Sequence, residues 1–306
     1  MAVSKLFPLA IIGGGPAGCT AGVYAKRANI EPVIFSSEPI GGKVWKTLLI
    51  ENFPSVKKTT GAKLAVNFQE QIRYLQIEVI TEVVINLRPQ SDGTFLVQTS
   101  EHTYRFQKVI IATGTREKKM PLAGFERLEG RGVSYCSSCD GYFFKGQTIA
   151  VVGSGNSALE ETKALAEIAK QVYIINREKT FQAQGILIRD VEKLPNVQIM
   201  HHHIVQTIEG QARLSGVVLQ DTITQKTTSL SLQGLFIYIG SLPNTSFIKS
   251  SLQILDKEGY IVTDQHFMTD ITGLYAIGDV VSDYIQQYTT AVSSATIALN
   301  HIIKSR

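Results

Sequence analysis

Short apolar runs alternate along the chain with glycine turns and with a helix-like spacing of apolar residues. The first run, Leu9 to Ile12, leads into Gly13-Gly14-Gly15-Pro16-Ala17-Gly18, and the small and apolar residues that follow indicate a helix ending near Asn29. A second apolar run, Pro32 to Phe35, comes next. Continuous apolar strands joined by a helix are typical of a parallel sheet buried on both faces. The N-terminal part of the chain therefore predicts a strand–helix–strand unit.

The same unit recurs in the middle of the chain. Thr148 to Val152 indicates a strand, Gly153-Ser154-Gly155-Asn156-Ser157-Ala158 a turn, Ala158 to Ala169 a helix and Val172 to Ile175 a second strand. Further segments expected to be extended are Lys108–Gly114, Val197–Met200, Ala212–Gln220, Thr227–Leu232, Leu235–Gly240 and Gly273–Val280, and a last helix is expected from about Gln287 to Ile303. The repeat predicts an α/β fold of two Rossmann-like dinucleotide-binding domains (three-layer ββα type), one inserted in the other. The expected boundaries are 1–115 and 244–306 for the outer domain and 116–243 for the inserted one.

The bulk composition is that of an enzyme rather than of a nucleic-acid-binding or membrane protein. The chain has 306 residues, 44% of them hydrophobic, which suffices for two cores. A net charge of +4 without a basic run does not indicate nucleic acid. No apolar stretch is long enough to span a bilayer, and the apolar start runs into a glycine loop instead of a signal-peptide cleavage site. We therefore expect a cytoplasmic, reducing location.

A pair of cysteines lies between the two glycine loops, in the run Cys136-Ser137-Ser138-Cys139-Asp140. Half of a zinc site is the alternative, but zinc needs four ligands and the only other cysteine is Cys19, inside the first loop. The histidines 201–203 follow an expected edge strand, where solvated or half-buried imidazoles are common. In a reducing compartment a C-x-x-C pair is more often a redox dithiol, so no metal is expected.

The glycine loops indicate nucleotide binding. Glycines allow a tight turn and a close approach of the backbone to a pyrophosphate, which then faces the N-terminus of the helix. In this pattern an acidic residue about twenty positions later holds a ribose hydroxyl, and Glu38 stands there, with an ordinary loop carboxylate as the alternative.

Additional short motifs accompany the loops and the dithiol: Gly41-Gly42, Glu51-Asn52-Phe53-Pro54, Ala112-Thr113-Gly114, Gly240-x-x-Pro243-Asn244-Thr245 and Gly278-Asp279-Val280. On these motifs the chain resembles the low-molecular-weight thioredoxin reductases over essentially its whole length. The resemblance implies a FAD domain built from both chain ends, an inserted nicotinamide-binding domain that carries the dithiol, and a homodimer. It also implies that Cys139 reacts with the flavin and that Cys136 attacks a thioredoxin-like or other dithiol/disulfide protein. Asp140 would manage the thiol proton, and a helix N-cap is its alternative role.

The expected site residues follow from this resemblance. The FAD site comprises Gly13, Gly15, Pro16, Ala17, Gly18, Ser36, Glu38, Gly41, Gly42, Lys43, Trp45, Asn52, Val83, Ala112, Thr113, Gly114, Gly278, Asp279, Gln287 and Tyr288. The second nucleotide site comprises Gly153, Gly155, Asn156, Ala158 and Arg177.

The chain departs from the family at the second nucleotide site. Members that use NADPH carry His-Arg-Arg-x-x-x-Arg, whose arginines hold the 2′-phosphate, whereas this chain reads Asn176-Arg177-Glu178-Lys179-Thr180-Phe181-Gln182. One arginine remains, one is replaced by glutamate and one by glutamine. A carboxylate beside a phosphate removes a charge-assisted hydrogen bond and adds repulsion, so NADPH is expected to bind poorly. Glu178 could instead hold the 2′-hydroxyl of NADH.

Two aromatic residues, Trp45 and Tyr288, stand where the family has small residues beside the flavin. Either ring could simply pack on the core or stack on a flavin face. Two rings together with a damaged clamp favour a nicotinamide-independent branch, similar to the diflavin-linked enzymes, with one tightly bound FAD and room for a second. The sequence thus predicts a FAD-dependent dithiol/disulfide oxidoreductase that is not driven by NADPH. The alternatives are an NAD(P)H-dependent thioredoxin reductase and, outside enzymes, a flavin-based redox or light sensor.

Overall fold

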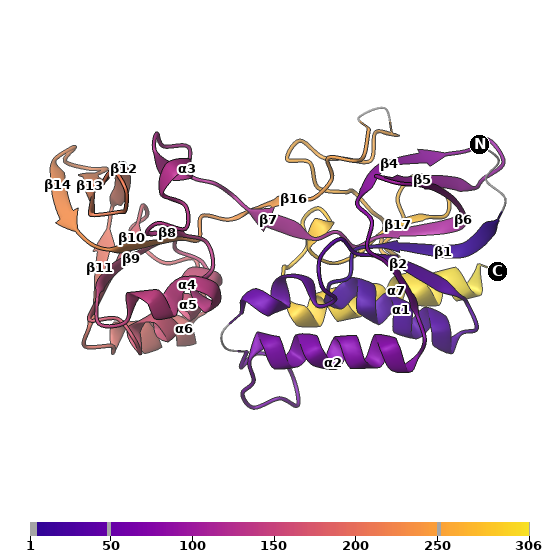
Figure 1. Ribbon diagram of the computed structural model, residues 1–306, viewed down its shortest axis with the longest axis horizontal. Coiled ribbons are helices and arrows are strands. Elements are labelled where there is room, and N and C mark those ends of the chain that lie inside the picture. Colours follow the sequence, from indigo (N-terminus) through magenta and orange to yellow (C-terminus); the bar gives the residue numbers. More distant parts are fainter. Residues whose placement is uncertain (1–4, 48–49, 250–251, 306) are drawn as a thin grey trace. The chain divides into compact units, whose positions relative to one another are not determined.

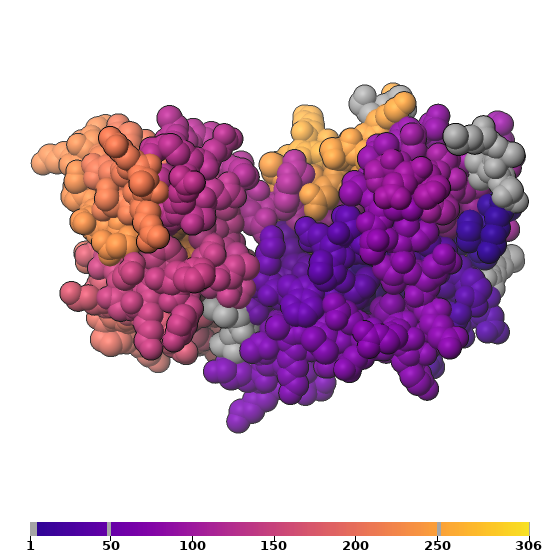
Figure 2. Space-filling model, viewed as in Figure 1, coloured from indigo at the N-terminus to yellow at the C-terminus, as the bar shows by residue number. Residues whose placement is uncertain are grey.

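The computed structural model describes residues 5–47, 50–249 and 252–305, and within them the chain forms two compact units. Unit 1 contains residues 5–45, 50–116 and 242–305, and unit 2 contains residues 117–241, with which residues 46 and 47 are grouped. Unit 1 therefore combines both ends of the sequence, and Figure 2 shows their indigo and orange atoms within one continuous surface. Strands β7 (Thr115–Glu117) and β16 (Ser241–Pro243) carry the chain from unit 1 to unit 2 and back, and they pair with each other.

Unit 1 is a three-layer ββα domain. Its seven-stranded sheet has the order β3-β2-β1-β6-β5-β4, with β17 also paired to β6. Helices α1, α2 and α7 cover one face of the parallel strands, and β4 and β5 lie on the other side (Figure 1). The elements are β1 (Leu6–Ile12), α1 (Pro16–Arg27), β2 (Pro32–Phe35), η1 (Gly42–Lys46), α2 (Gly61–Tyr74), β3 (Glu78–Ile80), β4 (Val84–Pro89), β5 (Phe95–Thr99), β6 (Thr103–Ile111), β17 (Leu274–Ala276), η4 (Gly278–Val280) and α7 (Tyr288–Lys304).

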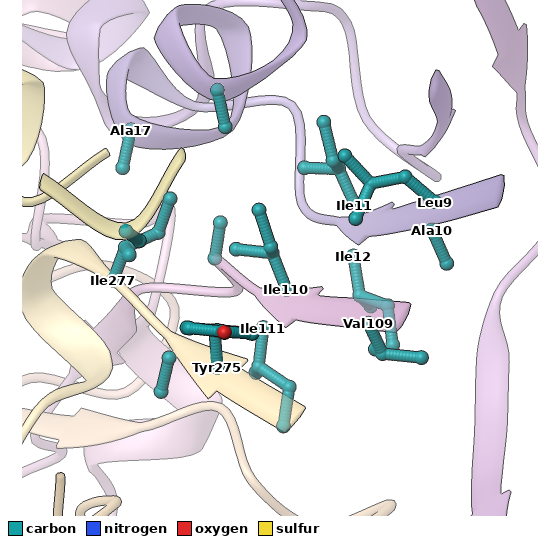
Figure 3. Packing of buried hydrophobic residues seen from close by; sticks show 14 of the residues in the cluster. Leu9, Ala10, Ile11, Ile12, Ala17, Val109, Ile110, Ile111, Tyr275 and Ile277 are labelled. Atoms are coloured by element: carbon teal, nitrogen blue, oxygen red, sulfur yellow. The ribbon is translucent and has the colours of Figure 1, made fainter. Parts of the chain in front are cut away.

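The core of unit 1 explains why its strands are continuous apolar runs. Strand β1 pairs in parallel with β2 on one side and β6 on the other, so neither edge of β1 is free. Leu9, Ala10, Ile11 and Ile12 are all buried, and they pack with Val109–Ile111, Tyr275 and Ile277 (Figure 3). A strand enclosed on both faces has no position for a polar side chain, which is what the sequence pattern indicates.

Unit 2 repeats this architecture. A parallel five-stranded sheet with the order β11-β10-β9-β15-β8 lies between three helices and a three-stranded antiparallel sheet, β12-β13-β14 (Figure 1). The elements are α3 (Phe125–Leu128), β8 (Val133–Ser134), α4 (Ser137–Asp140), η2 (Gly141–Phe144), β9 (Thr148–Val152), α5 (Asn156–Ala166), β10 (Gln171–Asn176), α6 (Gly185–Glu192), β11 (Val197–His201), β12 (His203–Glu209), β13 (Gly216–Asp221), β14 (Thr227–Ser231) and β15 (Gly234–Ile237).

Strand β9 shows how the middle layer is shared. Ala150 and Val152 belong to the apolar cluster that includes residues of the antiparallel sheet, and Ile149 and Val151 belong to the cluster that includes α5. Successive side chains of a strand point to opposite faces, so one apolar run serves two cores. The predicted fold class, two Rossmann-like domains with one inserted in the other, is confirmed.

Helix α5 begins at Asn156 and ends at Ala166, whereas the sequence pattern predicts Ala158 to Ala169. The side-chain amide of Asn196 donates to the carbonyl oxygens of Ala166 (2.9 Å) and Ala169 (3.1 Å), which satisfies acceptors left open by the end of the helix. Ile168 lies beyond the end of the helix and is half-buried.

Candidate functional site

The first glycine loop leaves an open cradle at the end of β1. Gly13 has a φ of 118°, and a Cβ atom there would collide with the carbonyl oxygen of Ala112. Around a Cβ atom on Gly15, by contrast, no atom of a described residue would lie within 4 Å. Helix α1 starts directly afterwards, with Gly15 as its N-cap and Pro16 in its first turn. The backbone can therefore approach a pyrophosphate closely, and the residues present fit this part of a FAD molecule.

The neighbouring parallel strands end at the same edge of the sheet. The Ile277 backbone N–H donates to Ile111 (2.9 Å), so the turn after β17 lies next to the turn after β6. Gly114 (φ 61°) and Gly278 (φ 71°) both adopt left-handed backbone there. The Gly278 N–H donates to Ser294 Oγ (3.0 Å), which anchors that turn to α7. The predicted residues Ala112–Gly114 and Gly278–Asp279 are thus brought beside the first glycine loop.

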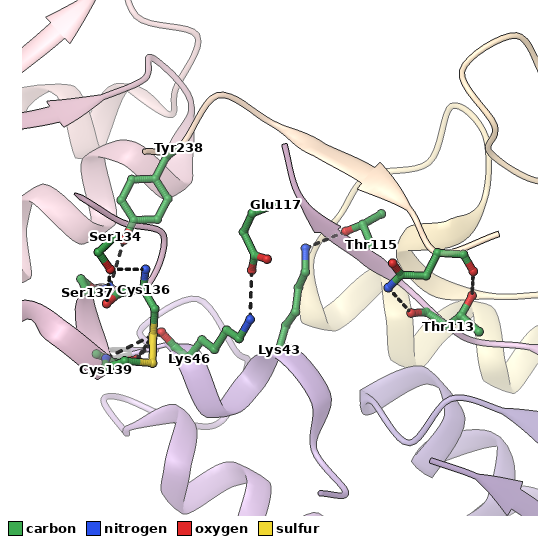
Figure 4. A network of polar contacts seen from close by, with 12 residues as sticks. Lys43, Lys46, Thr113, Thr115, Glu117, Ser134, Cys136, Ser137, Cys139 and Tyr238 are labelled. Atoms are coloured by element: carbon green, nitrogen blue, oxygen red, sulfur yellow. Dashed lines mark hydrogen bonds and ion pairs between the residues drawn. A yellow bond between two sulfur atoms is a disulfide. The ribbon is translucent and has the colours of Figure 1, made fainter. Parts of the chain in front are cut away.

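Two charged residues, Lys43 and Asp279, lie at this edge of the sheet. Lys43 Nζ donates to Thr115 Oγ1 at 2.7 Å (Figure 4). Burial raises the pKa of the Asp279 carboxyl, and the positive charge of Lys43 opposes that rise. A partly buried carboxylate beside an open cradle suits a hydroxyl-bearing ligand, because a hydroxyl can donate to it without adding charge.

Two residues of the expected FAD site, Ser36 and Glu38, follow β2. Ser36 is buried, and its hydroxyl donates to the backbone oxygen of Glu38 at 2.7 Å, while Glu38 itself is exposed. The Ser36 N–H donates to the Ile80 carbonyl (2.9 Å) at the end of β3, and Val83 follows three residues later with an exposed side chain.

Trp45 and Tyr288 pack on one small apolar cluster, formed by Val44, Ile50 and Ala65. The Trp45 indole N–H donates to the carbonyl oxygen of Ile40 at 2.9 Å. Tyr288 is the first residue of α7, so packing on the core, the alternative considered for both rings, accounts for the contacts that the structure describes.

Asn52 and Gln287 lie together, and the Asn52 amide donates to Gln287 Oε1 at 3.0 Å. Gln287 is the N-cap of α7, where it forms a reciprocal capping box with Thr290. The described contacts therefore give Gln287 a structural role in starting the helix.

The dithiol lies in unit 2, in the turn between β8 and η2. Cys136 and Cys139 form a disulfide, with their Cα atoms 5.3 Å apart. Cys136 is the N-cap of α4, and its sulfur accepts from the backbone N–H of Cys139 at 3.1 Å. The Ser138 hydroxyl lies 3.3 Å from the same sulfur. One turn of the chain therefore carries both sulfurs.

Asp140 occupies the N-cap position of η2 but does not cap it through its side chain. It precedes η2, yet no cap hydrogen bond forms; instead its carboxylate accepts from Ser134 Oγ at 2.6 Å. The same hydroxyl accepts from the Cys136 backbone N–H at 3.0 Å (Figure 4). Ser134 thus ties the carboxylate to the backbone of the first cysteine.

Three residues that sequence reasoning missed belong to the dithiol turn or contact it: Ser137, Glu161 and Tyr238. Ser137 is buried between the cysteines, its hydroxyl donates to Glu161 Oε2, and its backbone N–H donates to the Tyr238 hydroxyl at 3.1 Å. Burial raises the pKa of Glu161 to about 7. Burial, and secondarily the Glu161 charge, also raise the pKa of Tyr238. The position of Ser137 inside the C-x-x-C run was the one available signal, because Glu161 and Tyr238 reach it only through the fold.

The second glycine loop has the same form as the first. Gly153 has a φ of 151° and lies close to the carbonyl oxygen of Tyr238, whereas a Cβ atom on Gly155 would meet no atom of a described residue within 4 Å. Asn156 Oδ1 accepts from the Gln184 backbone N–H at 2.8 Å, and Ala158 is fully buried.

The segment expected to hold a 2′-phosphate lies against this loop. The Gln182 N–H donates to the Ser154 carbonyl at 2.8 Å. Arg177 Nε lies 3.0 Å from Glu178 Oε1, and the two side chains are 75% and 47% exposed. The remaining arginine of the clamp is therefore paired with the carboxylate that replaced its neighbour.

Two further expectations bear on other site types. The histidines 201–203 are half-buried at the junction of β11 and β12. In the described parts of the chain, the only group with metal-ligand spacing is Glu82, Glu101 and His102, which includes neither these histidines nor the cysteines. Across those same parts, the helices are too short or too polar to cross a membrane.

Comparisons with known proteins agree with the fold and the motifs. The family described as pyridine nucleotide-disulphide oxidoreductase matches residues 7–295. The thioredoxin reductase of Mycoplasma pneumoniae is 36% identical over 295 residues, which are 96% of this chain and 93% of the relative. The crystal structure of Lactococcus lactis thioredoxin reductase superimposes with a TM-score of 0.94 at 32% identity, covering 97% of this chain and 98% of that one.

A more distant similarity involves a reductase with another electron source in its name. The ferredoxin-flavin thioredoxin reductase of Clostridium acetobutylicum gives a TM-score of 0.54 at 28% identity, covering 98% of each chain. The proteins to which this chain is similar therefore include one with ferredoxin in its name.

Proposed function

The chain belongs to the pyridine nucleotide-disulphide oxidoreductase family and is a flavin-dependent disulfide oxidoreductase of the thioredoxin reductase type, and from this premise we propose that NADPH is not its electron donor. The observation that carries the proposal is the pairing of Arg177 with Glu178 at 3.0 Å. A 2′-phosphate at this position would meet one arginine already engaged by a carboxylate, and a neutral Gln182. Each charged hydrogen bond lost costs about 1.5–3 kcal/mol, so NADPH affinity falls by an order of magnitude or more.

The aromatic residues beside the first loop extend the proposal. Trp45 and Tyr288 pack on the same cluster, and a Cβ atom on Gly41 would lie 3.0 Å from the Trp45 indole nitrogen. Gly41 and Gly42 belong to the expected FAD site. We assign to Tyr288, and secondarily to Trp45, the role of covering a flavin face, where a second FAD can stack and nicotinamide cannot approach.

Bound FAD would supply a carrier of two electrons, which matches the two electrons of the Cys136–Cys139 couple. In the reduced protein, the Cys136 thiolate attacks a disulfide of the partner, so that a bond between the two proteins forms and the partner's S–S bond breaks. The Cys139 thiolate then displaces the partner's sulfur, the Cys136–Cys139 disulfide re-forms and the partner leaves as a dithiol. The Asp140 carboxylate, held by Ser134, takes up and returns a thiol proton. The same steps in reverse oxidise a dithiol.

The surface next to the dithiol suits a protein partner. Tyr142 and Phe143 follow Asp140 after a single glycine, Gly141, and they are 72% and 75% exposed. Exposed aromatic side chains are common at recognition surfaces, so we propose a thioredoxin-like or other dithiol/disulfide protein as the partner. A homodimer and a cytoplasmic location stay predictions.

One observation favours the alternative enzyme. The open second loop, Gly153 to Ala158, retains the form of a dinucleotide site, and Glu178 is placed after the second strand of that unit, where an acidic residue holds the ribose of NADH. Fast reduction by NADH would therefore select an NADH-dependent reductase. A redox or light sensor would show negligible turnover with every thiol substrate.

Anaerobic stopped-flow reduction, combined with extraction of flavin, tests the proposal. We expect excess NADPH to bleach the flavin slowly or not at all, wild type to hold close to two flavins per chain, and Tyr288→Ala to hold fewer. Tyr74→Ala, an exposed tyrosine at the end of α2, is the matched control and should keep the wild-type count. Rapid, saturable bleaching at micromolar NADPH would reject the donor proposal, and one flavin in all three proteins would reject the stacking role.

A further inference from the structure

Glu161 occupies an unusual position for a carboxylate. It lies on α5, the helix that begins at the second glycine loop, and its side chain faces α4, the single turn that carries the dithiol. Its partner there is the hydroxyl of Ser137, the buried residue between the two cysteines. The proposed exchange of electrons uses Cys136, Cys139 and Asp140, so it gives Glu161 no role.

Two contacts hold Ser137, in the middle of the dithiol turn. Ser137 is held through its side chain by Glu161. Its backbone N–H donates to the Tyr238 hydroxyl, 3.1 Å away, and Figure 4 shows these two residues. The backbone of Cys136 is held separately, by the Ser134 hydroxyl, which also donates to Asp140. Two sets of hydrogen bonds therefore orient one turn, and the set around Ser137 includes Glu161, whose pKa is raised to about 7.

We propose that Glu161 is a positioning residue of the dithiol, which through Ser137 holds the turn between the two sulfurs and whose protonation sets thiol reactivity across neutral pH. This inference rests on the proposed function, since it concerns the dithiol as a redox centre.

The charged groups around Glu161 support titration in this range. Burial is the main cause that raises its pKa to about 7, the hydrogen bond from Ser137 lowers it, and the Glu160 carboxylate on the same helix raises it further. Tyr238, which packs from the end of β15, stays protonated because burial raises its pKa. Above about pH 7 the Glu161 carboxyl is therefore an anion that contacts the dithiol turn. Below that pH the carboxyl is neutral.

The sign of the effect on the thiols follows from electrostatics. A nearby anion disfavours a thiolate and raises the pKa of the thiol, so ionised Glu161 slows reactions that need the thiolate. A change of one pKa unit alters the thiolate fraction tenfold, and for a neighbouring charge we expect a change on the order of threefold to tenfold. Glu161→Gln keeps an acceptor for Ser137 but removes the charge.

The test is the rate of iodoacetamide alkylation of the reduced protein from pH 5.5 to about 9, with Cys136 and Cys139 followed separately by mass spectrometry. For wild type we expect an additional inflection near pH 7. Glu161→Gln should lack it and should react on the order of threefold to tenfold faster than wild type at pH 8, with equal rates below pH 6. Ser137→Ala removes the hydrogen bond that favours the ionised carboxyl, so the inflection should move to higher pH.

Glu167→Gln is the matched control, because it removes an exposed carboxylate at the C-cap of the same helix and should leave the profile unchanged. Overlapping profiles for wild type and Glu161→Gln, or an equal change in the control, would overturn the inference. If Glu161→Gln does not fold, the direction of the Ser137→Ala shift decides: an inflection that stays or moves to lower pH is the overturning result.

Alkylation needs neither an electron donor nor a partner protein. A profile without the inflection in a protein that turns over disulfides therefore rejects only the role of Glu161. The inflection in a protein that turns over no disulfide rejects only the proposed function.

Discussion

Replacing Glu178 and Gln182 with arginine is expected to convert the second glycine loop into a 2′-phosphate site. The double substitution places cations at the two positions where this chain departs from the NADPH-binding pattern. It also removes the carboxylate that now lies 3.0 Å from Arg177 Nε, so three guanidinium groups become available to one phosphate. Arginine suits this role because its planar fork binds phosphate oxygens in pairs.

The number of new hydrogen bonds and their exposure set the expected gain in binding free energy. Two new charged hydrogen bonds give about 3–6 kcal/mol at the values for such bonds in proteins. The segment is well exposed, however, with Arg177 at 75% and Glu178 at 47%, so solvent screens these charges. We therefore expect about 2 kcal/mol, which is about thirtyfold in Kd. Release of Arg177 from Glu178 costs little, because an exposed ion pair contributes about 0–1 kcal/mol.

Calorimetric titration with 2′,5′-ADP measures this change without involving the flavin or the dithiol. The gain should shrink as salt is added, and binding of 5′-AMP, which lacks the 2′-phosphate, should not improve. Glu192→Arg, at an exposed residue at the end of α6, controls for the reversal of one charge outside the segment. If the double variant binds 2′,5′-ADP no better than this control, the segment is not a phosphate site and the argument against NADPH loses its basis.

Two further predictions concern buried groups. Because burial raises the pKa of the Cys19 thiol to about 12, the reduced native protein should present two thiols to a disulfide reagent, and the third of its three cysteines only after denaturation; three native thiols would contradict this. Because the folded protein binds a proton at Glu161 more tightly than the unfolded chain, stability should fall as the pH rises from 4.5 through about 7, by about 3 kcal/mol, and thermal unfolding of Glu161→Gln should lack that fall; parallel curves would contradict it.

The apolar pattern of the sequence predicted best the strands that are buried on both faces. Strands β2 and β9 occur at Pro32–Phe35 and Thr148–Val152 as predicted, because a strand enclosed on both faces is a continuous apolar run. The second glycine loop also marks where β9 ends. Helix α2 (Gly61–Tyr74) and strands β4 and β5 were not predicted. They bury only part of their surface, so their polar positions interrupt the pattern.

For the candidate site as well, the sequence predicts some residues and not others. The cysteines and glycines could be identified because their spacing is local. The contact of Glu161 with Ser137, and that of Asn52 with Gln287, join residues far apart in the sequence. The rotation of α5 about its axis decides whether Glu160 or Glu161 faces the dithiol turn. The neighbouring residues in the sequence do not distinguish these two glutamates.

The split of unit 1 between the two ends of the chain has a consequence for synthesis on the ribosome. Unit 2 is formed almost entirely by the continuous segment 117–241, so its strands can pair as soon as that segment has emerged. Unit 1 cannot close until α7, which follows unit 2 in the sequence, has been made and has packed on α1, which precedes unit 2. The nascent N-terminal sheet must therefore wait with an apolar face exposed while the inserted unit folds. Chaperone dependence should accordingly belong to the first segment of the chain, and the dithiol turn should be formed before the nucleotide cradle of unit 1 is complete.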